Sequence, residues 1–312
     1  MIELFTSAMT AEWNDFVSRS RQPSFLFDRG YMDYHSDRFS DFSLVARSAS
    51  GRILSLLPAE RRGVVVTSHG GLTYGGWITP LRHFSAATML DVMGEAVEFM
   101  HGAGVKELVY KPIPYIYCRQ PAQEDIYALF RHGAQMTACG ISSAIRLSSP
   151  APMNESTRQG IKLAISSGVT AVRSSDFSLF WPMLCSCLAE RHNGVAPTHT
   201  LAEMELLSSR FPDRILLYLA YKDGEPVAGA VVYVTERVVH TQYLATTAEG
   251  RRVKALALLI NQIAAEWTSS KAYLDFGTST ERGGELLNRG LLLQKSGHGA
   301  LGVAMPVYSM PV

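Results

Sequence analysis

Hydrophobic and polar positions follow two periods along this chain, one typical of strands and one typical of helices. The clearest helical period lies between residues 85 and 100, where Met89, Val92, Met93, Ala96, Val97 and Met100 recur on one face. The same spacing predicts further helices at 11–18, 31–35, 124–132, 158–166, 176–190, 201–209, 253–267 and 285–293. Short apolar runs predict strands at 42–46, 52–57, 64–66, 105–110, 141–147, 169–173, 215–221, 226–234, 238–244, 271–276 and 302–308. Strands mixed with helices in this way predict an α/β (α+β) protein.

Turn residues indicate several of the boundaries. Asp223-Gly224 between two apolar runs predicts a β-hairpin. His192-Asn193-Gly194 is a typical helix stop after 176–190, and the two prolines in 111–117 favour an extended segment. The turn-rich stretch 148–155 is the expected domain boundary, which gives domains 1–150 and 151–312.

The two halves repeat one order of elements: hairpin, polar strand end, long helix and strand. The hairpin glycines Gly51 and Gly224 differ by 173 positions (224 − 51), and His69 and His240, each at the end of an apolar strand, differ by 171 (240 − 69). This near-constant offset predicts a duplicated fold, although ordinary α/β alternation produces a similar order.

Composition narrows the function classes. A chain of 312 residues with 47% hydrophobic and 18% charged residues has ample material for a core. The net charge of +1 gives no electrostatic reason to expect DNA binding, and no apolar run is long enough to span a membrane. The start of the chain lacks the pattern of a signal peptide, so we expect a cytoplasmic protein. The four cysteines are expected to be structural thiols, and no pair has zinc-like spacing, so we expect no metal.

A basic turn between the strand 238–244 and the helix 253–267 is the most suggestive local feature. The first N–H groups of a helix are unpaired and carry partial positive charge. Arg251, Arg252 and Lys254 add cations there, and Gly250 allows close approach of a ligand. The turn is therefore either an anion-binding site or an ordinary, solvated βαβ connection.

Several stretches resemble a known family. They are Ser68-His69-Gly70-Gly71-Leu72-Thr73-Tyr74-Gly75-Gly76, Pro197-Thr198-His199-Thr200, His240-Thr241-Gln242-Tyr243, Tyr273-Leu274-Asp275-Phe276-Gly277-Thr278-Ser279 and Leu287-Asn288-Arg289-Gly290-Leu291. Together they resemble the FemAB-like acyltransferases of the GNAT superfamily, over nearly the whole chain. Residues 252–257 are similar to a degenerate R-x-x-G-x-A loop, in which alanine or another small residue replaces glycine.

The resemblance implies two tandem GNAT-like domains, each a mixed, mostly antiparallel sheet flanked by helices, with an interdomain cleft. The N-terminal domain would serve the acceptor and the C-terminal domain the donor. The implied donor is acyl-CoA, held without a metal by residues of the basic turn. These residues are Gly250, Arg251, Arg252, Val253, Lys254 and Ala255.

Acyl transfer needs a base, a polarised carbonyl and a protonated leaving group. The resemblance places the acyl group between the strands 238–244 and 271–276, so His240, Asp275 and Tyr243 are the candidate catalytic residues. A hydrogen-bonded sheet histidine, an ion-paired aspartate and a packing tyrosine are the structural alternatives. The glycine-rich loop 68–76 is expected to face the cleft between the halves. The candidate substrate-binding residues are His69, Thr73, Tyr74, Lys111, Tyr115, Gln242, Ser279 and Asn288.

Three functions follow as hypotheses. The first is transfer of an acyl group from acyl-CoA to an amine or hydroxyl of a small molecule, such as an amino sugar or a cell-envelope precursor. The second is Fem-type peptidyl transfer from aminoacyl-tRNA, which the absence of a basic run argues against. The third is a non-catalytic GNAT-like binding module.

Overall fold

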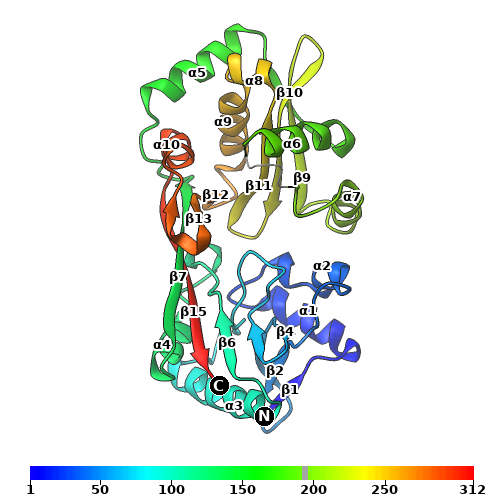
Figure 1. Ribbon diagram of the computed structural model, residues 1–312, viewed down its shortest axis with the longest axis vertical. Coiled ribbons are helices and arrows are strands. Elements are labelled where there is room, and N and C mark those ends of the chain that lie inside the picture. Colours follow the sequence, from blue (N-terminus) through cyan, green and yellow to red (C-terminus); the bar gives the residue numbers. More distant parts are fainter. Residues whose placement is uncertain (192–195) are drawn as a thin grey trace. The chain divides into compact units, whose positions relative to one another are not determined.

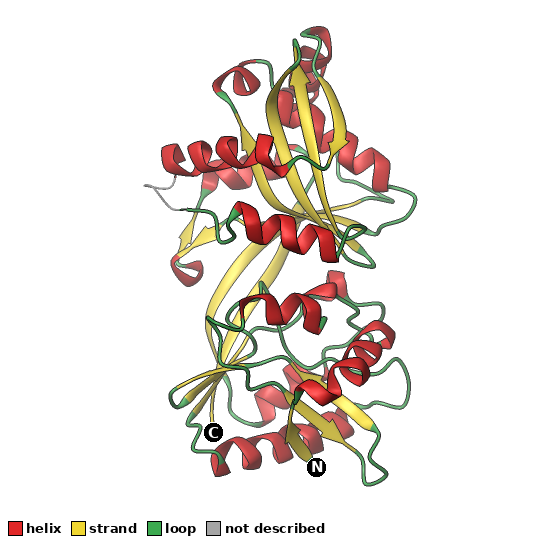
Figure 2. Ribbon diagram, turned by 90° about the vertical axis from the view of Figure 1, so that its right-hand side faces the viewer, coloured by secondary structure: helices red, strands yellow, loops and turns green. Residues whose placement is uncertain are grey.

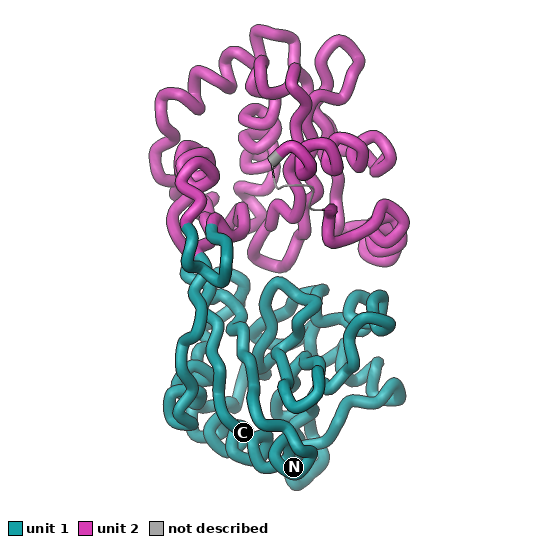
Figure 3. Tube along the Cα trace, viewed as in Figure 1, with its two compact units in different colours: residues 1–140, 280–286, 304–312 teal, residues 141–279, 287–303 magenta. Residues whose placement is uncertain are grey.

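The computed structural model describes residues 1–191 and 196–312 (Figure 1). The chain divides into two compact units (Figure 3): unit 1 comprises Met1–Gly140, Thr280–Leu286 and Ala304–Val312, and unit 2 comprises Ile141–Ser279 and Leu287–Val303. Strands β7 (Gln135–Arg146) and β15 (Leu301–Pro311) each run from one unit into the other. The domain boundary expected at residue 150 stays a prediction.

Unit 1 contains two groups of strands. Strands β1 (Ile2–Leu4), β2 (Leu44–Arg47) and β3 (Ile53–Leu57) form an antiparallel sheet. Strand β5 (Val65–Thr67) pairs with β4 (Glu60–Arg62) in antiparallel and with β6 (Glu107–Tyr110) in parallel orientation, and β6 also pairs with β15. The helices of this unit are α1 (Thr10–Arg19), α2 (Arg29–Met32), α3 (Ala86–Gly102) and α4 (Glu124–Arg131).

Helix α3 has the apolar face that the sequence predicts. Met89, Met93, Ala96 and Met100 are fully buried in the core of unit 1, and the side chain of Ser85 accepts a hydrogen bond from the N–H of Thr88 to cap the helix. The helix is therefore stabilised by burial along one stripe of apolar side chains.

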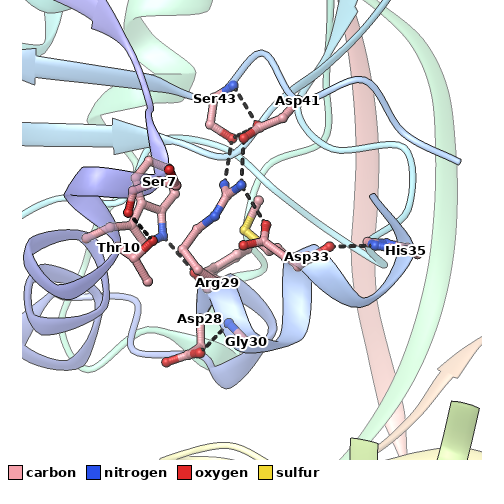
Figure 4. A network of polar contacts seen from close by, with 12 residues as sticks. Ser7, Thr10, Asp28, Arg29, Gly30, Asp33, His35, Asp41 and Ser43 are labelled. Atoms are coloured by element: carbon pink, nitrogen blue, oxygen red, sulfur yellow. Dashed lines mark hydrogen bonds and ion pairs between the residues drawn. The ribbon is translucent and has the colours of Figure 1, made fainter. Parts of the chain in front are cut away.

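A buried arginine ties together the first segments of unit 1 (Figure 4). Nη2 of Arg29 forms ion pairs with Asp41 at 2.6 Å and Asp33 at 2.7 Å, and Nη1 donates to Oγ of Ser43 at 3.3 Å. The guanidinium also lies 3.8 Å from the ring centroid of Phe5. Because Arg29 is only 4% exposed, these partners offset the cost of removing its charge from water.

Unit 2 is built on a six-stranded arrangement that includes part of β7 (Figure 2). Its order is β7-β12-β11-β10-β9-β8, with β8 (Thr170–Ser174), β9 (Ile215–Lys222), β10 (Glu225–Val234), β11 (Val238–Thr246) and β12 (Tyr273–Thr278). All of these neighbours are antiparallel except β11 and β12, which are parallel. The sheet is mixed and mostly antiparallel, which confirms the predicted fold class.

Helices pack on both faces of the sheet of unit 2. The helices are α5 (Glu155–Ser166), α6 (Phe177–Arg191), α7 (Leu201–Arg210), α8 (Ala248–Arg252), α9 (Ala255–Trp267) and α10 (Arg289–Gly297). The buried residues Leu259 and Ile263 of α9 share a core with Leu274 of β12. A Cβ at Gly229 of β10 would lie 2.4 Å from the ring of Phe180 of α6, so this glycine lets α6 approach the sheet closely. The helix stop expected at 192–194 lies outside the described residues.

The structure corrects several predicted elements. The helix expected at 253–267 is α9, which begins two residues later because Lys254 has a left-handed backbone (φ 58°), and the turn expected before it contains the short helix α8. The helix expected at 285–293 begins at Arg289, where Asn288 accepts a hydrogen bond from the N–H of Leu291. The segment expected to be extended contains a 3₁₀ turn at Tyr115–Tyr117. The sequence analysis missed four short strands: β1, β4, β13 (Thr280–Glu281) and β14 (Leu286–Leu287).

Among the described residues, no helix combines the length and apolar character needed to cross a bilayer.

Candidate active site

Strands β11 and β12 separate at one pair of residues. Their parallel ladder joins Val238 to Tyr273 and Val239 to Leu274 and ends at His240 and Asp275, while β11 continues to Thr246. On its other edge β11 has a bulge, because Val231 of β10 lies opposite Tyr243 whereas Val232 lies opposite Thr241. The bulge adds one residue to β11 at Gln242, where the two parallel strands part.

The bulge decides which side chains share a face of the sheet. Val239 and Leu244 both pack into the core that contains α9, although five positions separate them (244 − 239). An odd separation on one face requires the extra residue of the bulge, because side chains of a regular strand alternate. His240 and Tyr243 therefore both lie on the opposite face, where Tyr243 contacts the ring of Trp181 of α6.

His240 and Asp275 form a hydrogen-bonded pair at the separation point. Nδ1 of His240 lies 2.9 Å from Oδ2 of Asp275, and the two side chains are 13% and 5% exposed. A carboxylate accepts, so Nδ1 carries the proton of the neutral imidazole and Nε2 carries the lone pair. No hydrogen bond between described residues uses Nε2 of His240.

Tyr243 lies beside a second histidine. Its hydroxyl is 2.6 Å from Nδ1 of His199 and accepts a 3.3 Å hydrogen bond from the backbone N–H of the same residue. Burial raises the pKa of Tyr243, so the phenol keeps its proton at neutral pH. This face of the sheet therefore carries a proton donor, the hydroxyl of Tyr243, as well as a proton acceptor, Nε2 of His240.

Unit 2 also contains a cavity of about 600 Å³. It is lined by the first turns of α5 and α9, the end of β11, α8 and the second half of α10. The polar lining includes Thr157, Arg251, Lys254 and His298. Burial lowers the pKa of His298 to about 4, so its ring is neutral at physiological pH.

The predicted anion-binding turn divides into residues that line this cavity and residues that do not. Gly250, Arg251 and Lys254 line it, whereas Val253 and Ala255 are buried in the core. Arg252 is 69% exposed, does not line the cavity and pairs with Glu249 at 2.7 Å. Arg251 also has an acidic partner, Glu190 at 3.2 Å, and the arginine and lysine partners of Glu249 lower its pKa to about 2.

The structure gives Gly250 a second role. A Cβ at this position would lie 2.0 Å from the carbonyl oxygen of Val227 and 2.4 Å from the hydroxyl of Thr246. The glycine therefore allows α8 to pack closely on β10 and β11, in addition to lining the cavity.

Three residues of unit 2 were also predicted to bind substrate. Two of them have a local structural role, and the third is a buried serine. Asn288 caps α10, and Gln242 is the extra residue of the bulge. Ser279 is 1% exposed, its backbone N–H donates to the carbonyl of Ile141, and its hydroxyl has no partner among the described residues.

The predicted residues of unit 1 lie on one loop and one segment near β6. His69 is 3% exposed with a left-handed backbone (φ 31°), stacks on His35, and has its pKa lowered to about 3 by burial. Lys111 donates to the carbonyl of Leu72 at 2.8 Å, and burial lowers its pKa to about 8. Tyr74 is buried against Tyr117. Thr73 and Tyr115 are exposed.

Three residues that interact with the candidate catalytic residues escaped the sequence analysis as site residues. They are His199, Ser142, whose hydroxyl donates to Asp275 at 2.5 Å, and Lys295, whose Nζ donates to the carbonyl of Gly277 at 2.8 Å. From the sequence alone, a lysine on a helix is expected to lie at the surface, yet Lys295 is only 5% exposed. His199 lies in a stretch that carries the family resemblance, which was the one available signal.

Comparisons with known proteins agree with this architecture. Residues 154–282 match the family model of an acetyltransferase (GNAT) domain. A search of curated protein sequences finds no match. The crystal structure of FemX is similar over 100% of this chain and 97% of its own, with 11% identity and a TM-score of 0.72.

Two other solved structures are similar over most of both chains. One is the C-terminal domain of a putative lysylphosphatidylglycerol synthetase from Agrobacterium fabrum, with 14% identity and a TM-score of 0.62 over 97% of this chain and 92% of that one. The other is a tandem GNAT protein from the clavulanic acid biosynthesis pathway, with 11% identity and a TM-score of 0.55 over 100% and 98%. The sequence match to a GNAT domain is therefore confined to residues 154–282, while the likeness to these three structures shows that the whole chain shares their fold.

Proposed function

We propose that this protein transfers an acyl group from acyl-CoA to an amine or hydroxyl of a small molecule, such as an amino sugar or a cell-envelope precursor. The observation that carries the proposal is the His240–Asp275 pair at the point where β11 and β12 separate. A base held in one tautomer beside a gap in a sheet suits proton removal from a nucleophile.

The cavity of unit 2 fits an anionic donor. Arg251 and Lys254 supply positive charge, and the hydroxyl of Thr157 and the neutral ring of His298 supply uncharged polar groups. The donor would contribute a thioester, whose carbonyl carbon is open to attack by an amine. Arg252, Val253 and Ala255 have their partners elsewhere, so we assign donor binding to Gly250, Arg251 and Lys254.

In this proposal each proton has a protein partner. Nε2 of His240 accepts the proton that the acceptor amine loses as its nitrogen bonds to the acyl carbon, and Asp275 stabilises the imidazolium that forms. The carbon–sulfur bond breaks, and the hydroxyl of Tyr243 donates a proton to the leaving thiolate. His199 holds that hydroxyl in place. The products are an amide and a free thiol.

Acceptor recognition belongs to unit 1 in this proposal. The group of predicted residues there combines a half-buried lysine of lowered pKa, Lys111, with the exposed polar residues Thr73 and Tyr115. His69 and Tyr74 are buried, so their part is to hold the loop 68–76 in shape.

Aminoacyl transfer from an aminoacyl-tRNA is the second candidate. The likeness to FemX and to a lysylphosphatidylglycerol synthetase favours it. So does the pairing of Arg251 with Glu190, which reduces the positive charge available to a diphosphate. A non-catalytic binding module is the third candidate.

Calorimetric titration with coenzyme A separates these candidates. We expect binding to the wild-type protein and a loss of about 10-fold in affinity for Arg251→Glu and Lys254→Glu, because each removes a cation from the cavity. Lys162→Glu is the matched control, since Lys162 is an exposed residue of α5 that does not line the cavity. Absence of coenzyme A binding with binding of charged tRNA would support the second candidate. Absence of both would support the third.

A further inference from the structure

The carboxylate of Asp275 is held by a residue on the neighbouring antiparallel strand. Its Oδ2 faces Nδ1 of His240, while its Oδ1 accepts hydrogen bonds from Oγ of Ser142 at 2.5 Å and from the backbone N–H of Gly277 at 3.2 Å. Ser142 is 2% exposed and Asp275 is 3% exposed. The two oxygens therefore have different partners, and a rotation of the carboxylate would break contacts on both sides.

Strand pairing explains how Ser142 comes to this position. Asp275 of β12 lies opposite Ala144 of β7, whereas Thr278 lies opposite Ser142, so three steps on β12 match two steps on β7 (278 − 275 and 144 − 142). The extra residue bends β12 at Gly277, which has a positive φ of 72°. The bend returns the N–H of Gly277 to Oδ1 of Asp275, on the side where Ser142 also reaches it.

We infer that Ser142 is a positioning residue that, through Asp275, fixes the orientation of His240 and the position of its proton. The inference rests on the proposed role of His240 as a base and adds a member to its machinery. Ser142 donates to Asp275, and Asp275 accepts from His240, so Nε2 is left as the basic nitrogen.

Other groups around the pair define its electrostatic surroundings. Lys295 of α10 donates to the carbonyls of Gly277 at 2.8 Å and Thr278 at 2.6 Å, and its charge acts on Asp275. Tyr233 lies opposite His240 on β10, and Tyr243 shares the face of His240 on β11. The serine hydroxyl is the side-chain donor that lies 2.5 Å from Oδ1 of Asp275.

NMR of the His240 imidazole nitrogens tests the inference without donor or acceptor. In the wild type we expect the proton on Nδ1. In Ser142→Ala the carboxylate of Asp275 loses the donor that fixes its orientation, so it is free to rotate and holds the Nδ1–H of His240 less firmly. Part of the population should shift to the Nε2–H tautomer. Ser142→Thr, which keeps a hydroxyl, should restore the wild-type behaviour.

Ser143→Ala is the matched control. Ser143 is the next residue of β7, is fully buried, and its hydroxyl has no partner among the described residues. Ser143→Ala should leave the His240 signals unchanged. Asp275→Asn should change the tautomer of His240, which would show that the NMR signals report on this pair. Unchanged His240 signals in a folded Ser142→Ala protein would overturn the inference. Because the NMR measurement needs no turnover, that result is distinct from a failure of the proposed function, which coenzyme A binding decides.

Discussion

His240 and Asp275 are the last directly paired residues of β11 and β12, with Nδ1 of the histidine 2.9 Å from Oδ2 of the aspartate. The pair unites a titratable ring with a fixed anion at the place where two parallel strands separate. That placement distinguishes it from a histidine that only fills a hydrogen-bonding position within a continuous sheet.

Removal of either partner should lower turnover more than stability. We expect His240→Ala and Asp275→Asn to reduce kcat by about 10²-fold or more, because general base catalysis typically contributes this much. Thermal unfolding should change little for His240→Ala, since few buried contacts are lost. Parallel measurement of kcat and of the unfolding midpoint checks this, and a loss of folding equal to the loss of activity would show that the pair is structural.

Tyr243→Phe isolates the role of the hydroxyl. The ring keeps its contact with Trp181, while the hydrogen bonds of the hydroxyl, those with His199 among them, are lost. We expect kcat to fall about 10-fold or more with a thioester donor, with a smaller loss for a donor whose leaving group needs no proton. Steady-state kinetics with two such donors measure the difference; equal losses for both would contradict an acid role.

The stability of unit 1 should depend on the pH through Asp125. This carboxyl is buried, accepts a 2.6 Å hydrogen bond from the hydroxyl of Tyr110, and has its pKa raised by burial to about 6. The folded state then binds more protons than the unfolded state between about pH 4 and pH 6, so the free energy of unfolding falls as the pH rises through this window. The loss is at most about 3 kcal/mol.

Denaturant unfolding at a series of pH values between 4 and 7 measures this slope. Asp125→Asn cannot titrate and should flatten the curve. Asp91→Asn is the control, because Asp91 is an exposed residue of α3, and it should keep the wild-type slope. An unchanged slope in Asp125→Asn would assign the pH dependence to another group.

Two glycine substitutions should have opposite effects. Gly250→Ala places a methyl group 2.0 Å from the carbonyl oxygen of Val227, so we expect a destabilisation of about 2 kcal/mol or more. Gly94→Ala lies in the interior of α3 with nothing within 4 Å, so we expect a gain of about 0.5–1 kcal/mol from helix propensity. Urea unfolding measures the change in the free energy of unfolding for each variant. An unchanged free energy in Gly250→Ala would show that α8 can move away from the sheet.

Predicted helices and strands were confirmed where the hydrophobic period extends over enough residues. The stripe of α3 and the Asp223-Gly224 hairpin between β9 and β10 lie where the sequence places them. Strands of two or three residues, such as β13 and β4, have no repeat to read. Helices α8 and α9 are separated by the left-handed backbone of Lys254, and a lysine in the sequence does not indicate that conformation.

The sequence by itself determined the kind and order of the longer elements, because side-chain periodicity and turn chemistry act over a few residues, and it placed His240, Tyr243 and Asp275 on strands. That these two strands are neighbours was an expectation from the family resemblance, which their parallel ladder confirms. Only the tertiary structure decided that Ser142, more than a hundred positions from Asp275, supplies its hydrogen bond. It also decided that the bulge at Gln242 turns His240 and Tyr243 to one face. Both depend on strand register, and register is set by the packing of the whole sheet rather than by any local pattern.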